Sequence, residues 1–173
     1  GGGPQLTGAD RDLFARALTS VCRWLAIQMV KDGEGAEHAV RVVVTGARDG
    51  DEAEAVARAV GESSLVKTAI NGRDPNWGRV SQAVGQALAG SVGPVAEPVV
   101  AVDGVPYASA EATAVLARAE YDLEVALGRG DAGAELWVSD LAHAYVTIHA
   151  EYHPQGPGCR RVRLTGRRRL DPS

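Results

Sequence analysis

One glutamate in the first quarter of the sequence stands where a carboxylate could bind a ligand. Glu34 lies between Gly33 and Gly35 in the stretch KDGEGAEH, just after a run with helical periodicity. Because glycine has no side chain, these neighbours leave room beside the carboxylate and let a ligand approach closely. The same pattern is typical of an exposed loop at a helix end. Spacing alone favours the loop and leaves the binding role open.

The stretch VKTAINGRDPNWGRV, residues 66–80, is the densest in residues that fix local conformation. Pro75 after Asp74 predicts a turn into a helix, and Asp74 is expected to cap that helix. Trp77 would be a large anchor, and Arg79 could reach a carboxylate. No histidine or cysteine lies nearby to activate a nucleophile, so a rigid corner is favoured over a catalytic loop. Its members are Asp74, Pro75, Asn76, Trp77, Gly78 and Arg79.

The remaining polar motifs do not predict a metal or phosphate site. His149 and His153 are four residues apart, but Pro154 follows at once and no cysteine or acid completes a ligand set of familiar spacing. The stretch GRGDAG, residues 128–133, has glycines spaced loosely like a phosphate loop. It lacks the Lys–Ser/Thr pair and does not open a helix, so it is predicted to be a hairpin turn.

A long helix is expected to precede the Glu34 loop. The pattern predicts that it begins with Thr7 and Asp10 as a capping pair and ends after Val30, with Gly33 as a left-handed stop. Its apolar side chains recur at helical spacing and predict a stripe that faces the core. That stripe consists of Phe14, Leu18, Val21, Leu25 and Met29.

Further along, strand and helix patterns alternate. Residues 39–46 predict a strand with Val40, Val42 and Val44 on one face. Helices are predicted at 50–60, with Asp49 or Asp51 as cap, and at 76–88, 111–120 and in the first part of 140–154. Strands are predicted at 64–70, in a hairpin at 98–107, and as two strands around GRGDAG within 121–139. This order predicts a mixed sheet with helices stacked on it.

Composition and charge limit the class of protein. The chain has 173 residues, 45% of them apolar and 5% aromatic, which fits one α/β domain with an aliphatic core. The formal net charge is −4, yet six arginines lie between Arg160 and Arg169. The rest of the chain therefore carries about −10, which argues against a nucleic-acid partner.

The cysteines and the start of the chain bear on its compartment. Cys22 is expected to be a buried free thiol, and Cys159 lies in a Gly/Pro-rich stretch, so a disulfide scaffold is not expected. Residues 1–8 lack a secretory signal pattern, and no membrane span or membrane partner is predicted. A cytoplasmic location is therefore expected.

Three segments together resemble one known family. DGEGA at 32–36, LVKTAINGRDPNWGRV at 65–80 and SDLAHAYVTIHAEY at 139–152 resemble, in order and spacing, the β chain of the ornithine acetyltransferase (glutamate N-acetyltransferase) family. The DPNWGR block is highly specific to that family. The resemblance runs from about Lys31 to Tyr152 and is looser in the first helix.

The resemblance implies an α/β (α+β) fold, a layered α/β/β/α sandwich with mixed sheets, and no metal or organic cofactor. Members of the family move an acetyl group from N-acetylornithine to glutamate in arginine biosynthesis, and some use acetyl-coenzyme A as donor. The precursor cuts itself before a threonine, and the α and β chains stay together and assemble further. That threonine takes the acetyl group, with its own freed amine as general base.

The resemblance assigns substrate contacts to two positions of this chain. Glu34 matches a substrate-contacting glutamate, and its carboxylate suits the ammonium group of an amino acid. His149 stands where the family has an asparagine, and Pro154 where it has a hydroxyl residue. His149 can still hydrogen-bond a carboxylate, whereas Pro154 offers no side-chain donor. These departures are compatible with a specialised paralogue that acts on another amino acid.

No residue of this chain matches the nucleophile. The chain begins with Gly1, and Thr7 is internal, so the catalytic threonine is expected upstream and the chain alone is expected to be inactive. Residues 1–155 are then a partial β-chain domain, and residues 156–173 a Gly/Pro/Arg-rich, mobile tail. A truncated paralogue and a related hydrolase, in which water replaces the acceptor amine, are the alternatives. Missing neighbouring strands are expected to expose an apolar edge near residues 39–46 and to promote self-association.

Overall fold

The computed structural model describes residues 7–151, and these form one mixed five-stranded sheet with helices on it. The strands are β1 (Ala39–Ala47), β2 (Val99–Val102), β3 (Val105–Pro106), β4 (Glu120–Ala126) and β5 (Ala132–Ser139). Their order is β3-β2-β4-β1-β5, with β1 and β4 parallel and the other pairs antiparallel. The predicted α/β class with a mixed sheet is confirmed.

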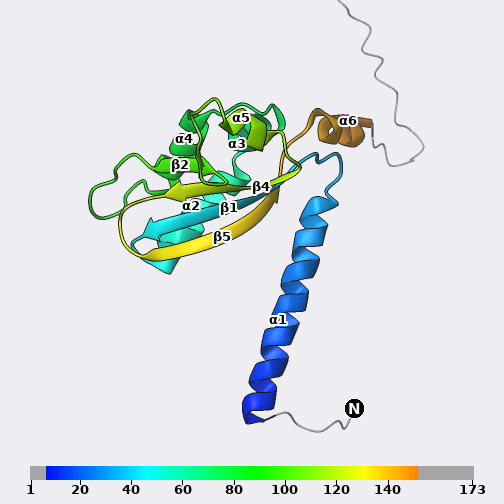
Figure 1. The fold of residues 1–173 in the computed structure, drawn as a ribbon, viewed down its shortest axis with the longest axis vertical. Coiled ribbons are helices and arrows are strands. Elements are labelled where there is room, and N and C mark those ends of the chain that lie inside the picture. Colours follow the sequence, from blue (N-terminus) through cyan, green and yellow to red (C-terminus); the bar gives the residue numbers. More distant parts are fainter. Residues whose placement is uncertain (1–6, 152–173) are drawn as a thin grey trace, which may run out of the picture.

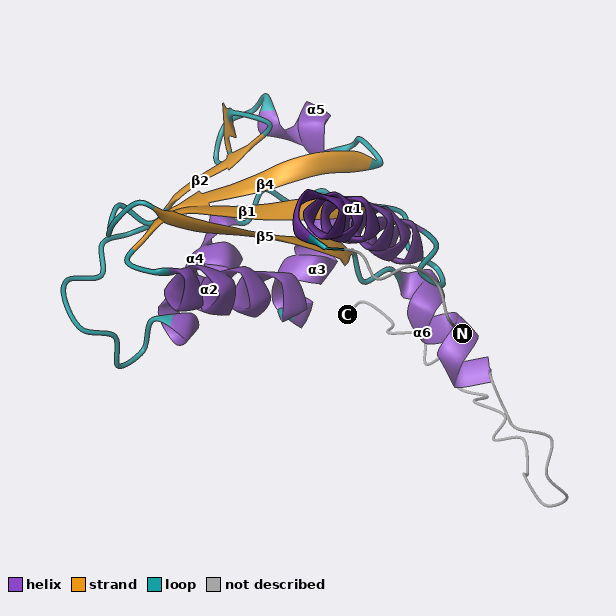
Figure 2. Cartoon of the chain, turned by 90° about the horizontal axis from the view of Figure 1, so that it is seen from below, coloured by secondary structure: helices purple, strands orange, loops and turns teal. Residues whose placement is uncertain are grey.

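Helices α2 (Gly50–Glu62), α3 (Ser64–Asn71) and α4 (Trp77–Ala87) cover one face of this sheet (Figure 2). The short α5 (Ala112–Leu116) lies near β2, while α1 (Gly8–Lys31) and α6 (His143–Glu151) extend from the body at the end where β1 begins (Figure 1). The described residues thus supply one sheet and one helical layer. A second sheet, as in the layered sandwich, stays an expectation for the rest of the protein.

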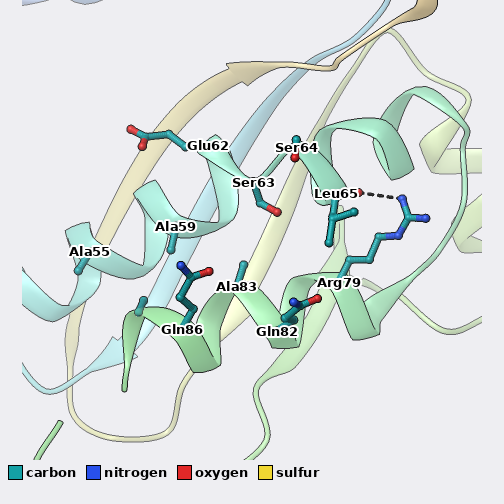
Figure 3. A pocket seen from close by; sticks show the side chains of 11 residues that line it. Ala55, Ala59, Glu62, Ser63, Ser64, Leu65, Arg79, Gln82, Ala83 and Gln86 are labelled. Atoms are coloured by element: carbon teal, nitrogen blue, oxygen red, sulfur yellow. Dashed lines mark hydrogen bonds between the residues drawn. The ribbon is translucent and has the colours of Figure 1, made fainter. Parts of the chain in front are cut away.

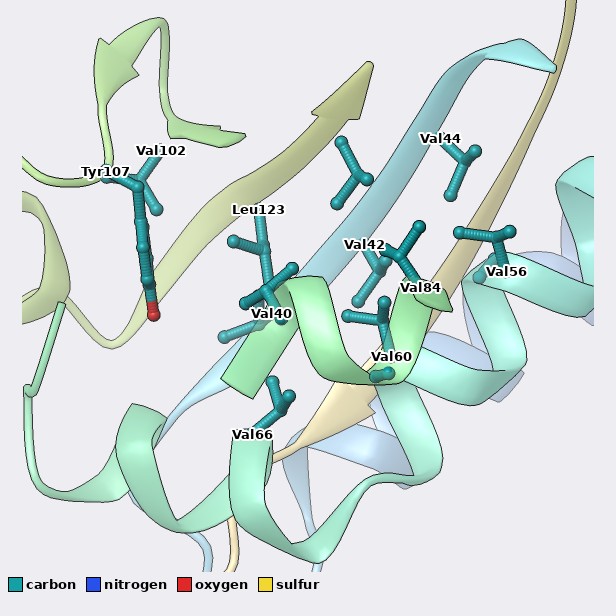
Figure 4. Packing of buried hydrophobic residues seen from close by; sticks show 14 of the residues in the cluster. Val40, Val42, Val44, Val56, Val60, Val66, Val84, Val102, Tyr107 and Leu123 are labelled. Carbon is teal, nitrogen blue, oxygen red and sulfur yellow. The ribbon is translucent and has the colours of Figure 1, made fainter. Parts of the chain in front are cut away.

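The core lies between the sheet and the helical layer and is built mainly from valine. Val40, Val42 and Val44 project from one face of β1, as predicted, and are fully buried against α2 and α4 (Figure 4). Short β-branched side chains let helices pack closely on a pleated surface, which explains how a chain poor in aromatic residues fills its core.

The opposite face of the sheet carries charged side chains, and strand β1 is not an edge strand. Arg41 on β1 donates from Nε to Asp122 Oδ1 of β4 over 2.9 Å, and its Nη1 lies 3.6 Å from Glu135 of β5. β1 is the strand between β4 and β5, flanked on both sides. The expectation of an apolar edge at residues 39–46 is wrong, because these residues form an inner strand.

Residues 64–70 were expected to form a strand and are instead helix α3. Its buried side chains are Val66, Ala69 and Ile70, which follow helical and not alternating spacing. Ser63 caps the helix by accepting a hydrogen bond from the amide of Val66. In a short apolar run the β-branched residues suggested a strand, but the cap and the packing of one helical face on the sheet decide for the helix.

Strands β4 and β5 do not form the predicted hairpin, because β1 lies between them. The GRGDAG stretch instead crosses the end of β1, where the amides of Arg129 and Gly130 donate to the carbonyl oxygen of Gly46 over 2.7 and 3.0 Å. A side chain at Gly130 would place its Cβ 2.6 Å from the carbonyl oxygen of Ala47. The glycines therefore serve close backbone approach at a crossover.

The same crossover contains a buried ion pair that the sequence did not predict. Arg129 donates from Nε and Nη2 to the two carboxylate oxygens of Glu52 over 2.8 and 3.1 Å. Both side chains are under 8% exposed. Arg129 also donates to the carbonyl oxygens of Val92 and Pro94, so it ties the loop before β2 to α2.

Helix α1 forms as predicted, but its apolar stripe does not face the core of this chain. Its five members are 49–76% exposed, and Cys22, expected to be buried, is exposed as well. The polar side instead meets the sheet, where Arg23 pairs with Glu135. Helical periodicity shows that a face is apolar but does not say which surface covers it.

The ends of α1 also differ from the expected ones. Thr7 holds the N-cap position without a side-chain hydrogen bond, so the capping pair with Asp10 does not form. At the other end the left-handed residue is Gly35, with φ +72°, and not Gly33. Helix α1 is also long and apolar enough to cross a membrane. Core helices of soluble proteins meet the same criterion of length and composition.

Candidate functional site

The loop after α1 presents Glu34 at the start of α6. Asp32 ends the helix by donating to the carbonyl oxygen of Gln28, and the amide of Ala36 closes a turn onto Gly33. Gly35 packs against the first turn of α6, where an added Cβ would lie 2.6 Å from the amide nitrogen of Tyr145. Only glycine fits this left-handed position in such close contact, so the DGEGA motif fixes the loop on α6.

Glu34 and His149, which the resemblance assigned to substrate, come together at this point. His149 Nε2 lies 3.4 Å from Glu34 Oε2, although the residues are far apart in the sequence. The ring of Tyr145, one helical turn earlier on α6, lies 4.3 Å from the His149 ring and steadies it from one side. The structure therefore places the two residues in one site.

The pair is open to solvent, with side-chain exposures of 67% for Glu34 and 50% for His149. An exposed carboxylate can bind an ammonium group, and an imidazole N–H can donate to a carboxylate. The two groups together match the two charged ends of an amino acid. In residues 7–151 neither group contacts a hydroxyl or thiol that it could activate, so the arrangement supports binding and not nucleophilic attack.

The DPNWGR block lies between α3 and α4 as a compact corner. Asn76, not Asp74, caps α4 by accepting from the amide of Arg79, and Asp74 accepts instead from the Asn76 side chain. Arg79 reaches no carboxylate of residues 7–151 and instead donates to the carbonyl oxygen of Leu65 over 2.9 Å and to the hydroxyl of Thr68 over 3.1 Å. Trp77 is half exposed. These contacts join the two helices, and the structural role of the block stays a prediction.

A groove of about 580 Å³ lies beside this corner, between α2, α3 and α4 (Figure 3). Its lining includes four alanines, Gln82 and Gln86 of α4, and Arg79. Neither Glu34 nor His149 lines it. The groove is therefore separate from the pair that the sequence singled out.

A buried carboxylate that the sequence did not predict, Asp140, lies behind the Glu34 loop. Asp140 Oδ1 accepts hydrogen bonds from the amides of Glu37 and His38, and Oδ2 accepts one from the side chain of Asn71. Asp140 follows β5 directly, in the SDLAHAY motif. An acid within a polar motif gives no sign of burial, because its partners lie tens of residues away.

The histidines of the described part do not meet around a common point. His38 is buried, and its Nδ1 lies 2.7 Å from the carbonyl oxygen of Arg118, which makes this nitrogen the donor. Between residues 7 and 151 no cluster of three or more histidine, cysteine, aspartate or glutamate side chains is arranged to hold a metal ion. His153, Pro154 and Cys159 lie outside the described residues.

Comparison with known proteins identifies the family. The ArgJ family profile matches residues 3–154. The chain belongs to the ArgJ family. It is 41% identical over 160 residues to the "Arginine biosynthesis bifunctional protein ArgJ" of Nitratidesulfovibrio vulgaris and 42% identical over 150 residues to the "Glutamate N-acetyltransferase" of Methanopyrus kandleri. The resemblance noted from the three motifs is confirmed.

The ArgJ fold also agrees with a solved structure. The crystal structure of arginine biosynthesis bifunctional protein ArgJ from Bacillus halodurans matches with a TM-score of 0.73 and 35% identity. The match covers 87% of this chain and 75% of that one. By contrast, this ArgJ chain spans only 40% of the length of the Nitratidesulfovibrio relative and 38% of that from Methanopyrus, while 87% and 80% of this chain are matched.

Proposed function

We propose that this chain forms the amino-acid-binding part of a glutamate N-acetyltransferase that takes its acetyl group from N-acetylornithine, in arginine biosynthesis. The observation that carries the proposal is the approach of His149 Nε2 to Glu34 Oε2 at 3.4 Å. It joins the two substrate positions that the family resemblance assigns. Membership of the ArgJ family and relatives that bear acetyltransferase names support the same reaction.

The chemistry needs a nucleophile that this chain does not supply. A threonine in the part of the protein beyond this chain attacks the acetyl carbonyl with its hydroxyl oxygen, and its free amine takes the hydroxyl proton. The C–N bond of N-acetylornithine breaks, and ornithine leaves after its amine receives that proton. The amine of glutamate then attacks the threonine ester, the acyl C–O bond breaks, and the proton of the glutamate amine passes through the threonine amine to the leaving hydroxyl oxygen. This two-step transfer gives ping-pong kinetics.

Within this reaction Glu34 holds the ammonium group of the substrate, and His149 donates to its carboxylate. Both are binding contacts, which orient the substrate amine or amide toward the acetyl-carrying threonine. The Glu34 loop is fixed by Gly35 against α6, so the carboxylate meets the substrate from a rigid support. Acetyl-coenzyme A remains a second possible donor, and no metal or bound cofactor is needed.

The lengths of the relatives support a protein made of two chains. The same part of this chain corresponds to 40% of the Nitratidesulfovibrio protein but to 75% of the solved Bacillus chain. The solved chain is thus about half as long as the curated protein, as self-cleavage of a precursor would produce. We therefore propose an α and a β chain that stay together and assemble into further copies.

The exposed apolar face of α1 supports the same partnership. Large apolar side chains, among them Phe14, Leu18 and Leu25, are exposed on α1, while Arg23 on its opposite side meets the sheet. An apolar helix face of this width needs cover. We propose that the companion chain supplies it. A cytoplasmic protein with neither membrane nor nucleic acid as partner is the corresponding expectation.

The two-step reaction is tested by trapping its intermediate in the full-length protein. Incubation with N-acetylornithine alone should add one acetyl group to a threonine at the head of a chain, detected by mass spectrometry, and release ornithine. Later addition of glutamate should remove that group and yield N-acetylglutamate. Free acetate in place of N-acetylglutamate would identify the hydrolase alternative, and absence of the acetylated threonine would contradict the mechanism.

A paralogue specialised for another amino acid is the second candidate, and one observation favours it. In the resemblance the family has an asparagine where this chain has His149, and here His149 approaches Glu34. An imidazole is larger than an amide and occupies space beside the carboxylate. A panel of amino-acid acceptors, offered to the acetylated protein, decides between the two: the acceptor with the highest kcat/KM is the substrate.

A further inference from the structure

Asp140 joins the three segments that carry the family motifs. Its side chain is buried, with 4% of the residue exposed. Oδ1 accepts from the amides of Glu37 and His38 over 3.0 and 3.2 Å, in the segment that follows Glu34. Oδ2 accepts from Asn71 Nδ2 over 2.7 Å, at the end of α3 and just before the DPNWGR block.

The backbone around Asp140 repeats these connections. Its amide donates to the carbonyl oxygen of His38 over 3.1 Å, and the next amide, of Leu141, donates to the carbonyl oxygen of Lys67 on α3 over 3.2 Å. Two residues later the chain enters α6, which carries His149. Asp140 thus lies where the Glu34 loop, α3 and the start of α6 meet.

Glu34 depends on this junction for its position. In the described part of the chain its carboxylate has one polar contact, with His149, and the side chain is exposed. The position of an exposed side chain with one weak contact is set mainly by its backbone. That backbone is fixed by Gly35, which packs against α6, and then by the amides of Glu37 and His38, which are bound to Asp140.

We propose that Asp140 is a positioning residue that holds Glu34 opposite His149 and thereby sets the affinity of the site for its amino-acid substrate. The proposal rests on the proposed function for the substrate, while the positioning of Glu34 can be tested without it. A buried carboxylate is favourable only where its oxygens are hydrogen-bonded. All three donors at Asp140 are neutral N–H groups, and among residues 7–151 no lysine or arginine forms an ion pair with it.

The chemistry of the side chain explains why aspartate stands at this position. A carboxylate offers acceptors on both oxygens, and here both are used. Asparagine has one oxygen and one NH₂ group. With its oxygen toward the backbone amides, its NH₂ would face the NH₂ of Asn71, donor against donor. Asp140→Asn therefore breaks the link to α3, although its size and shape are unchanged.

An exchange of the two side chains restores the link and serves as the decisive variant. In the double variant Asp140→Asn/Asn71→Asp, the oxygen of the new amide accepts from Glu37 and His38, and its NH₂ donates to the new carboxylate at position 71. Val56→Ala is the matched control, because Val56 is fully buried in the core on α2 and takes no part in the junction. It lowers stability without touching the Glu34 loop.

Kinetics of acetyl transfer in the full-length protein give the first readout. Asp140→Asn should raise KM for the amino-acid substrate about tenfold, because Glu34 is displaced. The exchange variant should recover most of that loss, and Val56→Ala should leave KM unchanged while its Tm falls. Equal KM in the wild type and Asp140→Asn, or a rise in Val56→Ala that matches it, would overturn the proposal.

NMR of the His149 ring gives a second readout that does not depend on activity. In the wild type, Glu34→Gln should change the chemical shifts of the His149 ring at a fixed pH, since the two side chains are in contact. In the Asp140→Asn background the same substitution should have little effect, and the exchange variant should restore it. If Glu34→Gln has the same effect in the wild type and in the Asp140→Asn background, the positioning role is refuted, whether or not the protein transfers acetyl groups. A failure of acetyl transfer alone would refute only the proposed function.

Discussion

His149 Nε2 and Glu34 Oε2 lie 3.4 Å apart, one on helix α6 and the other in the loop after α1. The contact connects the DGEGA motif with the SDLAHAYVTIHAEY segment, residues 139–152. It also sets two demands on Glu34. His149 lies against the carboxylate, and in the proposed function a substrate ammonium must compete for the same oxygens.

Replacement of His149 by asparagine should therefore improve substrate binding. Exposed ion pairs contribute up to about 1 kcal/mol, so removal of the competitor should lower KM for the amino-acid substrate by at most about fivefold. Steady-state kinetics at one fixed pH would measure this. His149→Ala is the control, since it removes both the competitor and the hydrogen-bond donor. The amide of asparagine can still donate to the substrate carboxylate, so a KM that rises in His149→Asn would show that competition for Glu34 does not limit binding.

The buried pair of Arg129 and Glu52 should dominate the stability of the crossover loop. Arg129→Met leaves the Glu52 carboxylate buried without its main partner, which should lower the free energy of unfolding by about 3–5 kcal/mol. The double variant Arg129→Met/Glu52→Gln removes the buried charge as well and should recover part of that loss. Urea denaturation of all three proteins measures the difference. If the double variant is less stable than Arg129→Met, the pair is not the source of the effect.

The same pair predicts a loss of stability in acid. Hydrogen bonds from Arg129, with a smaller contribution from Arg48, hold the pKa of the Glu52 carboxyl below its usual range. A carboxyl whose pKa is lowered in the folded state stabilises the fold above its unfolded pKa and loses that contribution as the pH falls through the folded value. Unfolding free energies measured from pH 7 down to pH 3 should fall less steeply in Arg129→Met/Glu52→Gln than in the wild type. Parallel curves would contradict this assignment.

Ionisation of Tyr107 should lower the free energy of unfolding at alkaline pH. Burial, with the negative charge of Asp74, raises the pKa of Tyr107 to about 12. A group whose pKa is raised on folding contributes stability that is complete below its unfolded pKa and is lost as the pH rises through the folded one. Between about pH 10 and pH 12 the wild type should therefore lose stability that Tyr107→Phe keeps. At pH 7 the two should differ little, because the hydroxyl has no partner among the described residues.

The apolar face of α1 should govern association. Leu18→Glu should reduce self-association of this chain when it is prepared alone and weaken its assembly with the companion chain. Arg16→Glu is the matched control, because at 100° per residue positions 16 and 18 lie on nearly opposite sides of the helix. Sedimentation velocity measures both effects. If Leu18→Glu instead abolishes binding to lipid vesicles and leaves assembly intact, α1 is a membrane contact.

The sequence was informative where the local pattern and the packing agree. β1 has alternating valines, α2 has the cap Asp49, and the β2–β3 hairpin has Asp103 and Gly104 in left-handed conformations at its turn. Each of these elements follows from neighbours within a few residues. For α3 the local pattern was ambiguous, since a short apolar run with β-branched residues fits a strand and a helix equally.

What the sequence could not supply are contacts between distant residues. Asp140 finds its donors 69 to 103 positions away, and Arg129 finds Glu52 at a separation of 77. Neither pairing produces a periodic pattern in the sequence. The crossover between β4 and β5 was missed for the same reason, because a glycine-rich turn does not reveal whether the strands it joins are adjacent. The meeting of Glu34 and His149 was reached only through the family resemblance.

The most direct test of the account is acetyl transfer from N-acetylornithine to glutamate by the full-length protein and its Glu34→Ala variant. Glu97→Ala is the matched control, an exposed glutamate in the loop before β2. The account predicts that kcat/KM falls at least about tenfold in Glu34→Ala, the loss of one charge-assisted contact, and stays unchanged in Glu97→Ala. Equal kcat/KM in the wild type and Glu34→Ala would contradict the central claim that this carboxylate binds the substrate.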